Sequence, residues 1–206
     1  MAPSAPSDEF DRRILRRTLE LAREAVRAGS SPIGCVIVDA AGKVLSEGYN
    51  RSSLPWPEEP QEIGSSGLAH AEMVAFFKIG KIQDPHGWTL YTSLEPCLMC
   101  GGAIGMLGLQ RVVWACDDPW GGSGRLIEWN EHPAYLRIQV TPCPFPDLEE
   151  EAAMLFAPEA KSVYGAEGWQ RWRERYPEIC ARFEDAPQAT HPLRELQAEI
   201  VREEDG

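Results

Sequence analysis

The segment TLYTSLEPCLMCGGAIGMLGLQRVVWAC, residues 89–116, sets the fold class of this chain. TLYTSL and RVVWAC are short apolar runs of the kind that form buried strands, and the pattern from about Cys97 to Leu107 between them is helical. A strand, a helix and a second strand in succession predict a layered α/β domain with helices on both faces of a sheet.

The same alternation continues on both sides of this segment. The further elements that we expect are a helix, two strands, a helix and another strand, at residues 7–29, 33–39, 43–50, 69–79 and 136–141. Two long loops rich in Gly, Pro, Ser or Trp separate them, at residues 51–67 and 117–132. Loops of this length are often functional.

The chain divides by composition into a domain at residues 8–145 and a C-terminal extension at residues 146–206. Within the extension, residues 147–157 and 166–183 look helical and rich in aromatics, and residues 191–206 form an amphipathic acidic tail. With 206 residues, 43% of them hydrophobic, the chain is long enough to bury an ordinary core.

The net charge of −12 weighs against nucleic acid as a partner, because acidic surfaces repel phosphate. The charge is concentrated in residues 146–206, which hold 15 acidic and 7 basic residues. Six arginines of the first helix are the best argument for RNA, but Glu20 and Glu24 lie in the same helix, and a solvated face explains them better.

We expect a cytosolic protein without a membrane partner. No run of 18 apolar residues is present, and the N-terminal residues lack the basic start and apolar stretch of a secretory signal. In the cytosol, the six cysteines are thiols or metal ligands rather than a disulfide frame.

Cys97 and Cys100 form a C-x-x-C motif at the start of the predicted helix. Free N–H groups and the helix dipole at this position lower thiol pKa values. Alone, the motif is compatible with a redox pair, half of a structural zinc site, or chance. There is no second C-x-x-C, which disfavours a four-cysteine site, and a redox pair leaves the next motif unexplained.

That motif is His70-Ala71-Glu72, in the apolar stretch GLAHAEMVAFF at residues 67–77. One histidine and two cysteines make three zinc ligands, and catalytic zinc takes three protein ligands and keeps a water in its fourth position. Such a water has a pKa of about 7 and needs a base, for which Glu72 is placed. We therefore expect one Zn²⁺ per chain, with its water or hydroxide, bound by His70, Cys97 and Cys100.

The complete pattern H-x-E…P-C-x-x-C, with 27 residues between His70 and Cys97, is the signature of zinc nucleobase deaminases. SPIGCVIVD, EGYN, AHAE, LYTSLEPCLMCGGAI and RVVWACDDPWGG resemble successive landmarks of the cytidine and deoxycytidylate deaminase superfamily. The likeness is greatest to the bacterial branch of tRNA adenosine, guanine and cytosine deaminases, over residues of about 8–155.

This resemblance implies a three-layer αβα fold with a five-stranded mixed sheet, hydrolytic loss of ammonia, and a homodimer. By the same resemblance, Glu72 is the catalytic acid and base, and the N–H of Cys97 faces the oxygen on the attacked carbon. Asn50, the N–H of Ala71 and Asp118 are the expected substrate contacts. The PWGG sequence after Asp118 departs from the loop that is usual in tRNA adenosine deaminases.

Three hypotheses for function remain. The first is a deaminase of a free nucleobase, nucleoside or related heterocycle, which the acidic extension favours because the corresponding helix of tRNA deaminases is typically basic. The second is a tRNA wobble-adenosine deaminase, with tRNA as the partner. The third is an inactive interaction module that retains zinc, which would not need Glu72.

Overall fold

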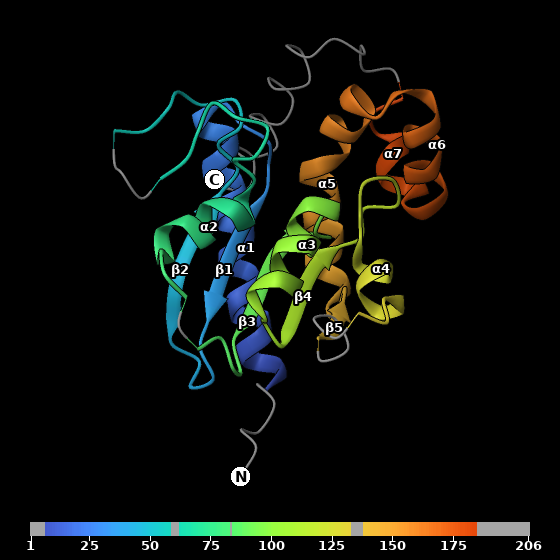
Figure 1. Ribbon diagram of the computed structural model, residues 1–206. Helices are drawn as coiled ribbons and strands as arrows, with labels where there is room; N and C mark the ends of the chain where they lie inside the picture. Colours follow the sequence, from blue (N-terminus) through green and yellow to red (C-terminus); the bar gives the residue numbers. More distant parts are fainter. Residues whose placement is uncertain (1–6, 59–61, 83, 133–137, 185–206) are drawn as a thin grey trace.

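The computed structural model describes residues 7–58, 62–82, 84–132 and 138–184, and its centre is one five-stranded sheet (Figure 1). The strand order is β2-β1-β3-β4-β5. The strands are β1 (Gly34–Val38), β2 (Val44–Tyr49), β3 (Thr89–Leu94), β4 (Arg111–Cys116) and β5 (Gln139–Pro142).

The sheet is mixed, as the resemblance implied. Strand β1 runs antiparallel to both β2 and β3, whereas β3, β4 and β5 are parallel to one another. Parallel neighbours need a crossover, and α3 and α4 lie in the two crossovers. The carboxyl ends of β3 and β4 therefore lie at one edge of the sheet, where loops carrying chemistry commonly gather.

Helices cover both faces of the sheet, so the predicted three-layer αβα arrangement is confirmed (Figure 1). Successive strand residues point to opposite faces: Val36 packs in the cluster that contains α1, α5, α6 and α7, and Ile37 packs in the cluster that contains α2, α3 and α4. The helices are α1 (Asp8–Ala28), α2 (Ala71–Ile79), α3 (Leu98–Leu107), α4 (Gly124–Trp129), α5 (Pro146–Val163), α6 (Gly165–Arg175) and α7 (Pro177–Ala181).

The first helix shows how closely local sequence signals set the boundaries. The Ser7 hydroxyl caps α1 by accepting a hydrogen bond from the Phe10 N–H at 3.3 Å, and Gly29 ends it in a left-handed conformation with φ of 89°. Between them Leu15 and Leu19 are fully buried against the sheet. None of the helices in the described ranges is long and apolar enough to span a membrane.

Three helical segments differ from the sequence predictions. The segment predicted as one loop at 117–132 contains the short helix α4. Helix α5 continues past Pro158 to Val163, although proline lacks the N–H for an intrahelical hydrogen bond. Burial explains the continuation, because Ala157, Pro158 and Ala160 all lie in the interior. The helix predicted at 166–183 is interrupted after Arg175, and α7 begins at Pro177.

The C-terminal helices share a core with the sheet. Leu155 of α5 and Trp172 of α6 belong to the same buried cluster as Tyr91 of β3 and Val113 of β4. The division at residue 145 remains a prediction about sequence organisation. The predicted tail at 191–206 lies outside the described residues.

Candidate metal centre and active site

The three predicted zinc ligands meet at the amino-terminal ends of two helices. His70 is the residue that precedes α2, and Cys97 is the residue that precedes α3, both with extended backbone. Cys100 lies in the first turn of α3 and is buried. Free backbone N–H groups and the helix dipoles at these two ends favour negatively charged ligands such as thiolates.

Their donor atoms are spaced as a tetrahedral metal requires. The Nδ1 atom of His70 lies 3.4 Å from the Cys97 sulfur and 3.7 Å from the Cys100 sulfur, and all three atoms lie within 4.8 Å of one another. Ligands at zinc–nitrogen and zinc–sulfur bond lengths are roughly 3.5–3.8 Å apart in a tetrahedron. Two thiols and one imidazole thus fit Zn²⁺ and leave a fourth position for another ligand.

The protein environment prepares the Cys97 thiol for metal binding. A hydrogen bond from Cys100, with His70 also in contact, lowers the pKa of Cys97 to about 4 although the group is half-buried. The hydrogen bond to Cys97 in turn raises the pKa of His70. A thiolate is the form that binds metals, so one ligand is already in the reactive state at neutral pH.

Glu72 is a buried carboxylate beside these ligands. Its exposed fraction is 3%, and burial together with the charge of Cys97 raises its pKa. Its side chain also contacts Cys100 by a hydrogen bond. A raised pKa makes the protonated form of a carboxyl group easier to reach, which suits an acid–base catalyst.

Two of the predicted substrate contacts lie near His70. Ala71 is next to it in the chain, and the residue after Asn50, Arg51, donates its N–H to the Ala69 carbonyl at 2.8 Å. Ala71 is the first residue of α2, so its N–H has no intrahelical acceptor. Asn50 follows β2 and is 3% exposed, and its Oδ1 accepts hydrogen bonds from Ser30 and Ser52. Among the described residues its amide nitrogen has no hydrogen-bond acceptor, so Asn50 can still donate to a ligand.

Asp118, the third predicted substrate contact, is placed differently. It is 5% exposed, and its carboxylate accepts hydrogen bonds from the N–H groups of Trp120 and Gly121 in its own loop. It also accepts from the Tyr164 hydroxyl at 2.7 Å and the Trp172 indole at 3.2 Å. The structure therefore joins Asp118 to the C-terminal helices, which sequence reasoning did not foresee.

Sequence reasoning also missed two residues that fasten this loop to the metal centre. The Glu95 carboxylate accepts hydrogen bonds from the N–H groups of Asp118 and Gly124, at 3.0 and 2.7 Å. The Ser123 hydroxyl donates to the carbonyl groups of Pro96 and Cys97. Glu95 directly precedes Pro96 of the motif, which was the available signal. Nothing in the sequence marked Ser123.

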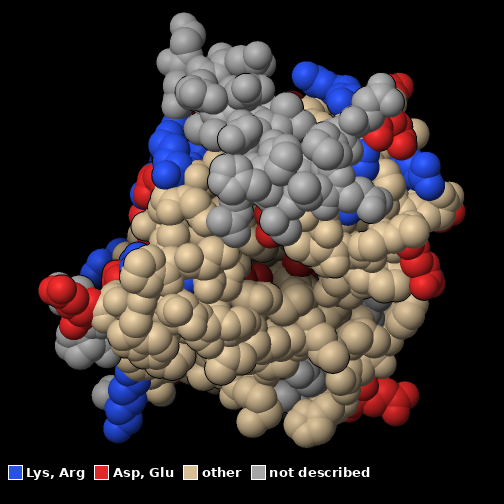
Figure 2. All heavy atoms as spheres, turned by 90° about the horizontal axis from the view of Figure 1, so that it is seen from above, with Lys and Arg blue, Asp and Glu red and all other residues tan. Residues whose placement is uncertain are grey.

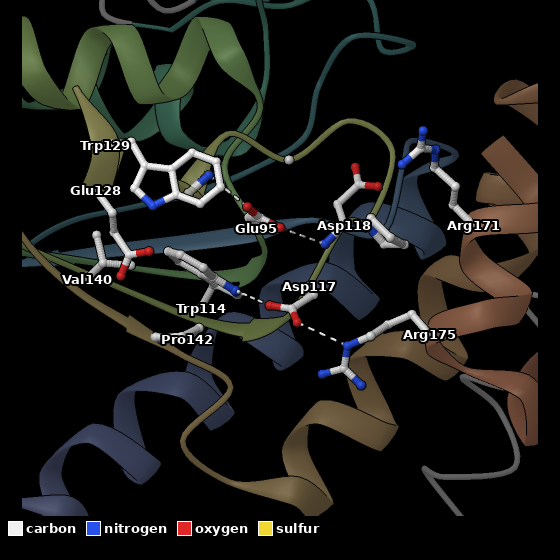
Figure 3. A pocket seen from close by; sticks show the side chains of 13 residues that line it. Glu95, Trp114, Asp117, Asp118, Glu128, Trp129, Val140, Pro142, Arg171 and Arg175 are labelled. Atoms are coloured by element: carbon white, nitrogen blue, oxygen red, sulfur yellow. Dashed lines mark hydrogen bonds and ion pairs between the residues drawn. The ribbon is translucent and has the colours of Figure 1, made fainter. Parts of the chain in front are cut away.

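A cavity of about 640 Å³ lies on the outer side of this loop, between α4 and α6 (Figure 3). The residues that line it include Trp114, Trp129, Glu128, Glu95, Arg171 and Arg175. Figure 3 shows Asp117 joined to both Trp114 and Arg175 at its floor. None of its lining residues is a predicted zinc ligand.

A second group of possible metal ligands, Asp117, Cys143 and Glu149, lies beside that cavity. Arg175 already pairs with both carboxylates, at 3.1 Å with Asp117 and more closely with Glu149. A resident guanidinium neutralises the charge that a metal would neutralise. We therefore assign this group to packing between β5, α5 and α6.

Figure 2 shows how charged side chains are distributed on the face of the molecule seen from above. In the described part of this face, both basic and acidic side chains lie around the edge, and further acidic atoms lie in a hollow near the centre. Three exposed apolar side chains lie near the site residues in the chain, namely Leu68, Leu98 and Trp120. The described part of this face is therefore not a broad basic surface.

Comparison with known proteins assigns the family. Residues 8–116 match the cytidine and deoxycytidylate deaminase zinc-binding region. The matched segment contains His70, Glu72, Cys97 and Cys100. The chain belongs to this family of zinc-dependent deaminases.

Individual relatives differ in the substrate that they are named for. A tRNA-specific adenosine deaminase of Haemophilus influenzae is 39% identical over 113 residues, which are 53% of this chain and 60% of that protein. A probable cytosine deaminase of Schizosaccharomyces pombe is 36% identical over 116 residues, which are 56% and 65% of the two chains. This chain thus spans less than two thirds of either relative.

A solved structure from a study of A-to-I editing by tRNA:A34 deaminases at the wobble position of transfer RNA is similar in fold. The TM-score is 0.53 at 27% identity, and the match covers 64% of this chain and 98% of that one. The family match ends at residue 116, so the loop with Asp118 and the helices α5–α7 lie beyond it.

Proposed function

We propose that this protein is a hydrolytic deaminase that replaces an amino group on a nucleobase ring with oxygen and releases ammonia. The observation that supports this most directly is the cluster of His70, Cys97 and Cys100 donors within 4.8 Å of one another, with Glu72 buried beside them. An inactive zinc-holding module would not need the buried carboxylate, whose desolvation costs free energy.

In this proposal His70, Cys97 and Cys100 bind Zn²⁺, which lowers the pKa of a water to about 7 and so supplies the nucleophile. Glu72 would accept one proton from the attacking water and pass it to the ring nitrogen. It would then take the second proton of the same water from the new C–OH group and pass it to the leaving amine, which departs as ammonia. Asn50 and the Ala71 N–H orient the ring, and the Cys97 N–H faces the new oxygen.

For the substrate we propose adenosine in tRNA, the second of the sequence-based hypotheses. The named relatives support it better than the free base or nucleoside that the charge favoured. The match is to the zinc-binding half of the chain, however, and the RNA contacts of this proposal would have to come from other segments. Arg171 of α6 is a candidate, since its guanidinium lies 5.7 Å from the ring centroid of Trp120 in the loop that follows β4.

A free base or nucleoside is the second candidate, and surface charge is the observation that favours it. Basic and acidic side chains both lie around the edge of the described part of the face in Figure 2, and the chain as a whole carries −12. An enzyme that binds phosphates through several Lys or Arg contacts shows a steep fall in affinity with salt. An enzyme that acts on a free base or nucleoside shows no such fall in affinity with salt.

The deciding experiment is ammonia release by zinc-loaded protein at low and high salt, with Glu72→Gln as the matched control. The panel holds an adenosine-containing anticodon stem-loop, adenine, guanine, cytosine and their nucleosides. Salt-sensitive turnover of the stem-loop alone supports the tRNA substrate. Turnover of a free base or nucleoside supports the second candidate. If no substrate of the panel shows turnover that depends on Glu72, the deaminase proposal is rejected.

The proposal includes the cytosol as the compartment, where thiol ligands stay reduced. It also includes a homodimer, by resemblance to neighbouring members of the branch. Sedimentation of the zinc-loaded protein tests the second statement.

A further inference from the structure

The loop at residues 117–123 contacts the metal centre on one side. Gly122 pairs with Cys97 as an isolated β-bridge, and the Ser123 hydroxyl donates to the carbonyl of Cys97 at 3.0 Å. The loop therefore lies against the backbone of a zinc ligand, and a shift of the loop changes the surroundings of that ligand.

The C-terminal helices hold the same loop on its other side. Asp118 accepts a hydrogen bond from the Trp172 indole at 3.2 Å and another from the Tyr164 hydroxyl at 2.7 Å. Trp172 belongs to α6 and is fully buried, and Tyr164 joins α5 to α6. A buried carboxylate is costly to leave unpaired, so Asp118 fixes the loop to these two donors.

Packing leaves the two donors little freedom. The ring of Phe156 lies 5.5 Å from that of Trp172 and 6.1 Å from that of Tyr164, measured between centroids. A Cβ atom on Gly121 would lie 2.7 Å from an Asp118 oxygen and 3.0 Å from the Tyr164 oxygen. A side chain at position 121 would therefore push the Asp118 carboxylate or the Tyr164 hydroxyl out of place.

We propose that Tyr164 and Trp172 are positioning residues for the deaminase site, acting through Asp118 on the loop 117–123. This inference rests on the proposed function for its kinetic part. It assigns the C-terminal helices a role in substrate binding although they contain no predicted catalytic residue. Asp118 then serves the site as a structural anchor of the loop instead of as a direct substrate contact.

The chain provides a matched control. Trp169, like Trp172, is a buried tryptophan of α6, but its indole nitrogen has no hydrogen-bond partner among the described residues. Trp169→Phe and Trp172→Phe remove similar volumes from the same helix. Only Trp172→Phe removes a hydrogen bond to Asp118. Tyr164→Phe removes the other hydrogen bond and deletes a single oxygen atom.

The first readout needs no substrate. Amide hydrogen exchange is measured at residues 117–123 in the full-length, zinc-loaded variants. We expect faster exchange in Trp172→Phe and Tyr164→Phe and wild-type exchange in Trp169→Phe. Equal exchange in all three variants overturns the inference, and Tyr164→Phe decides the matter if Trp172→Phe does not fold.

The second readout is the division of the kinetic change between KM and kcat. Loss of one hydrogen bond to a charged group is expected to raise KM about tenfold, with kcat changed less than about twofold. An equal fall of kcat in Trp169→Phe and Trp172→Phe would point to packing alone and reject the positioning role. Altered loop exchange, with no turnover by the wild-type protein or by any variant, supports the anchoring and rejects the deaminase proposal.

Discussion

Two buried polar clusters lie at opposite ends of the central strands β3 and β4, and they differ in how their charges are balanced. At the start of β4, Arg111 pairs with Asp11 of α1 at 2.5 Å, and the Tyr91 hydroxyl donates to the same carboxylate. This cluster contains its own cation. The cluster that follows β3 consists of thiols, an imidazole and a carboxylate, a set that suits a metal cation. The charges of the first cluster are balanced within the protein, so its role is structural. The second cluster suits a metal cation.

Of the changes that test this comparison, removal of zinc is expected to have the largest effect on activity. Cys100→Ala, or dialysis against a chelator, should reduce deaminase activity to background because the nucleophile is lost. Zinc at about 100 times its Kd stabilises a protein by about 2.7 kcal/mol, so the Tm should fall as well. Metal analysis and calorimetry test this. Full activity after complete zinc removal would contradict it.

The next largest effect is expected from Glu72→Gln, which keeps the shape of the side chain and removes its proton transfer. We expect kcat to fall by about 10²–10⁴-fold with one zinc still bound per chain. Steady-state kinetics beside metal analysis gives both numbers. Loss of the metal in Glu72→Gln would show that Glu72 supports the centre instead of the chemistry.

Loss of the Arg111–Asp11 pair should have the opposite effect: it should lower stability and leave the metal centre intact. Arg111→Met leaves the Asp11 carboxylate buried without its cation, and breaking such a pair costs about 3–5 kcal/mol. We expect a lower denaturant midpoint, with zinc content and kcat unchanged at temperatures where the variant is folded. The double change Arg111→Met with Asp11→Leu should recover part of the loss. A drop in zinc content would mean that the two clusters are coupled.

A smaller effect is expected from Gly48→Ala, because Gly48 is where β2 approaches the start of α2. An added Cβ would lie 2.6 Å from the Ala71 carbonyl oxygen and must push the helix outward. Overpacking of this kind costs about 1–3 kcal/mol. The displaced helix carries His70, so zinc affinity should fall too.

The control for this change is Gly34→Ala, where the added Cβ would meet the Thr18 carbonyl of α1 at 2.1 Å. It should lower the stability and leave zinc affinity unchanged, because α1 carries no ligand. Competition with a chromogenic chelator measures both affinities. If both variants bind zinc equally well, α2 does not depend on this contact.

The fold and the metal centre could be predicted from the sequence because local patterns encode them. Apolar runs gave β3 and β4 at their observed bounds, and the ligand spacing placed His70 and Cys97 at neighbouring helix starts. The connections of Asp118 could not be predicted in this way. Its partners Tyr164 and Trp172 are 46 and 54 residues away, and only tertiary packing brings them to the loop.

Two local failures have different causes. Pro158 is a helix breaker by propensity, but burial of α5 outweighs the lost hydrogen bond. Helix α4 was read as loop because its six residues are too few for a helical period to be recognised.

The packing of the first helix against the last ones has a consequence for synthesis on the ribosome. Arg23 of α1 pairs with Glu151 of α5 at 2.5 Å, and Leu19 belongs to the same buried cluster as Trp172 and Phe183. The apolar side of α1 therefore cannot be fully covered until α5, which ends at Val163, has been made. We expect nascent chains that stop before α5 to aggregate or to recruit a chaperone, because contacts between distant segments form late.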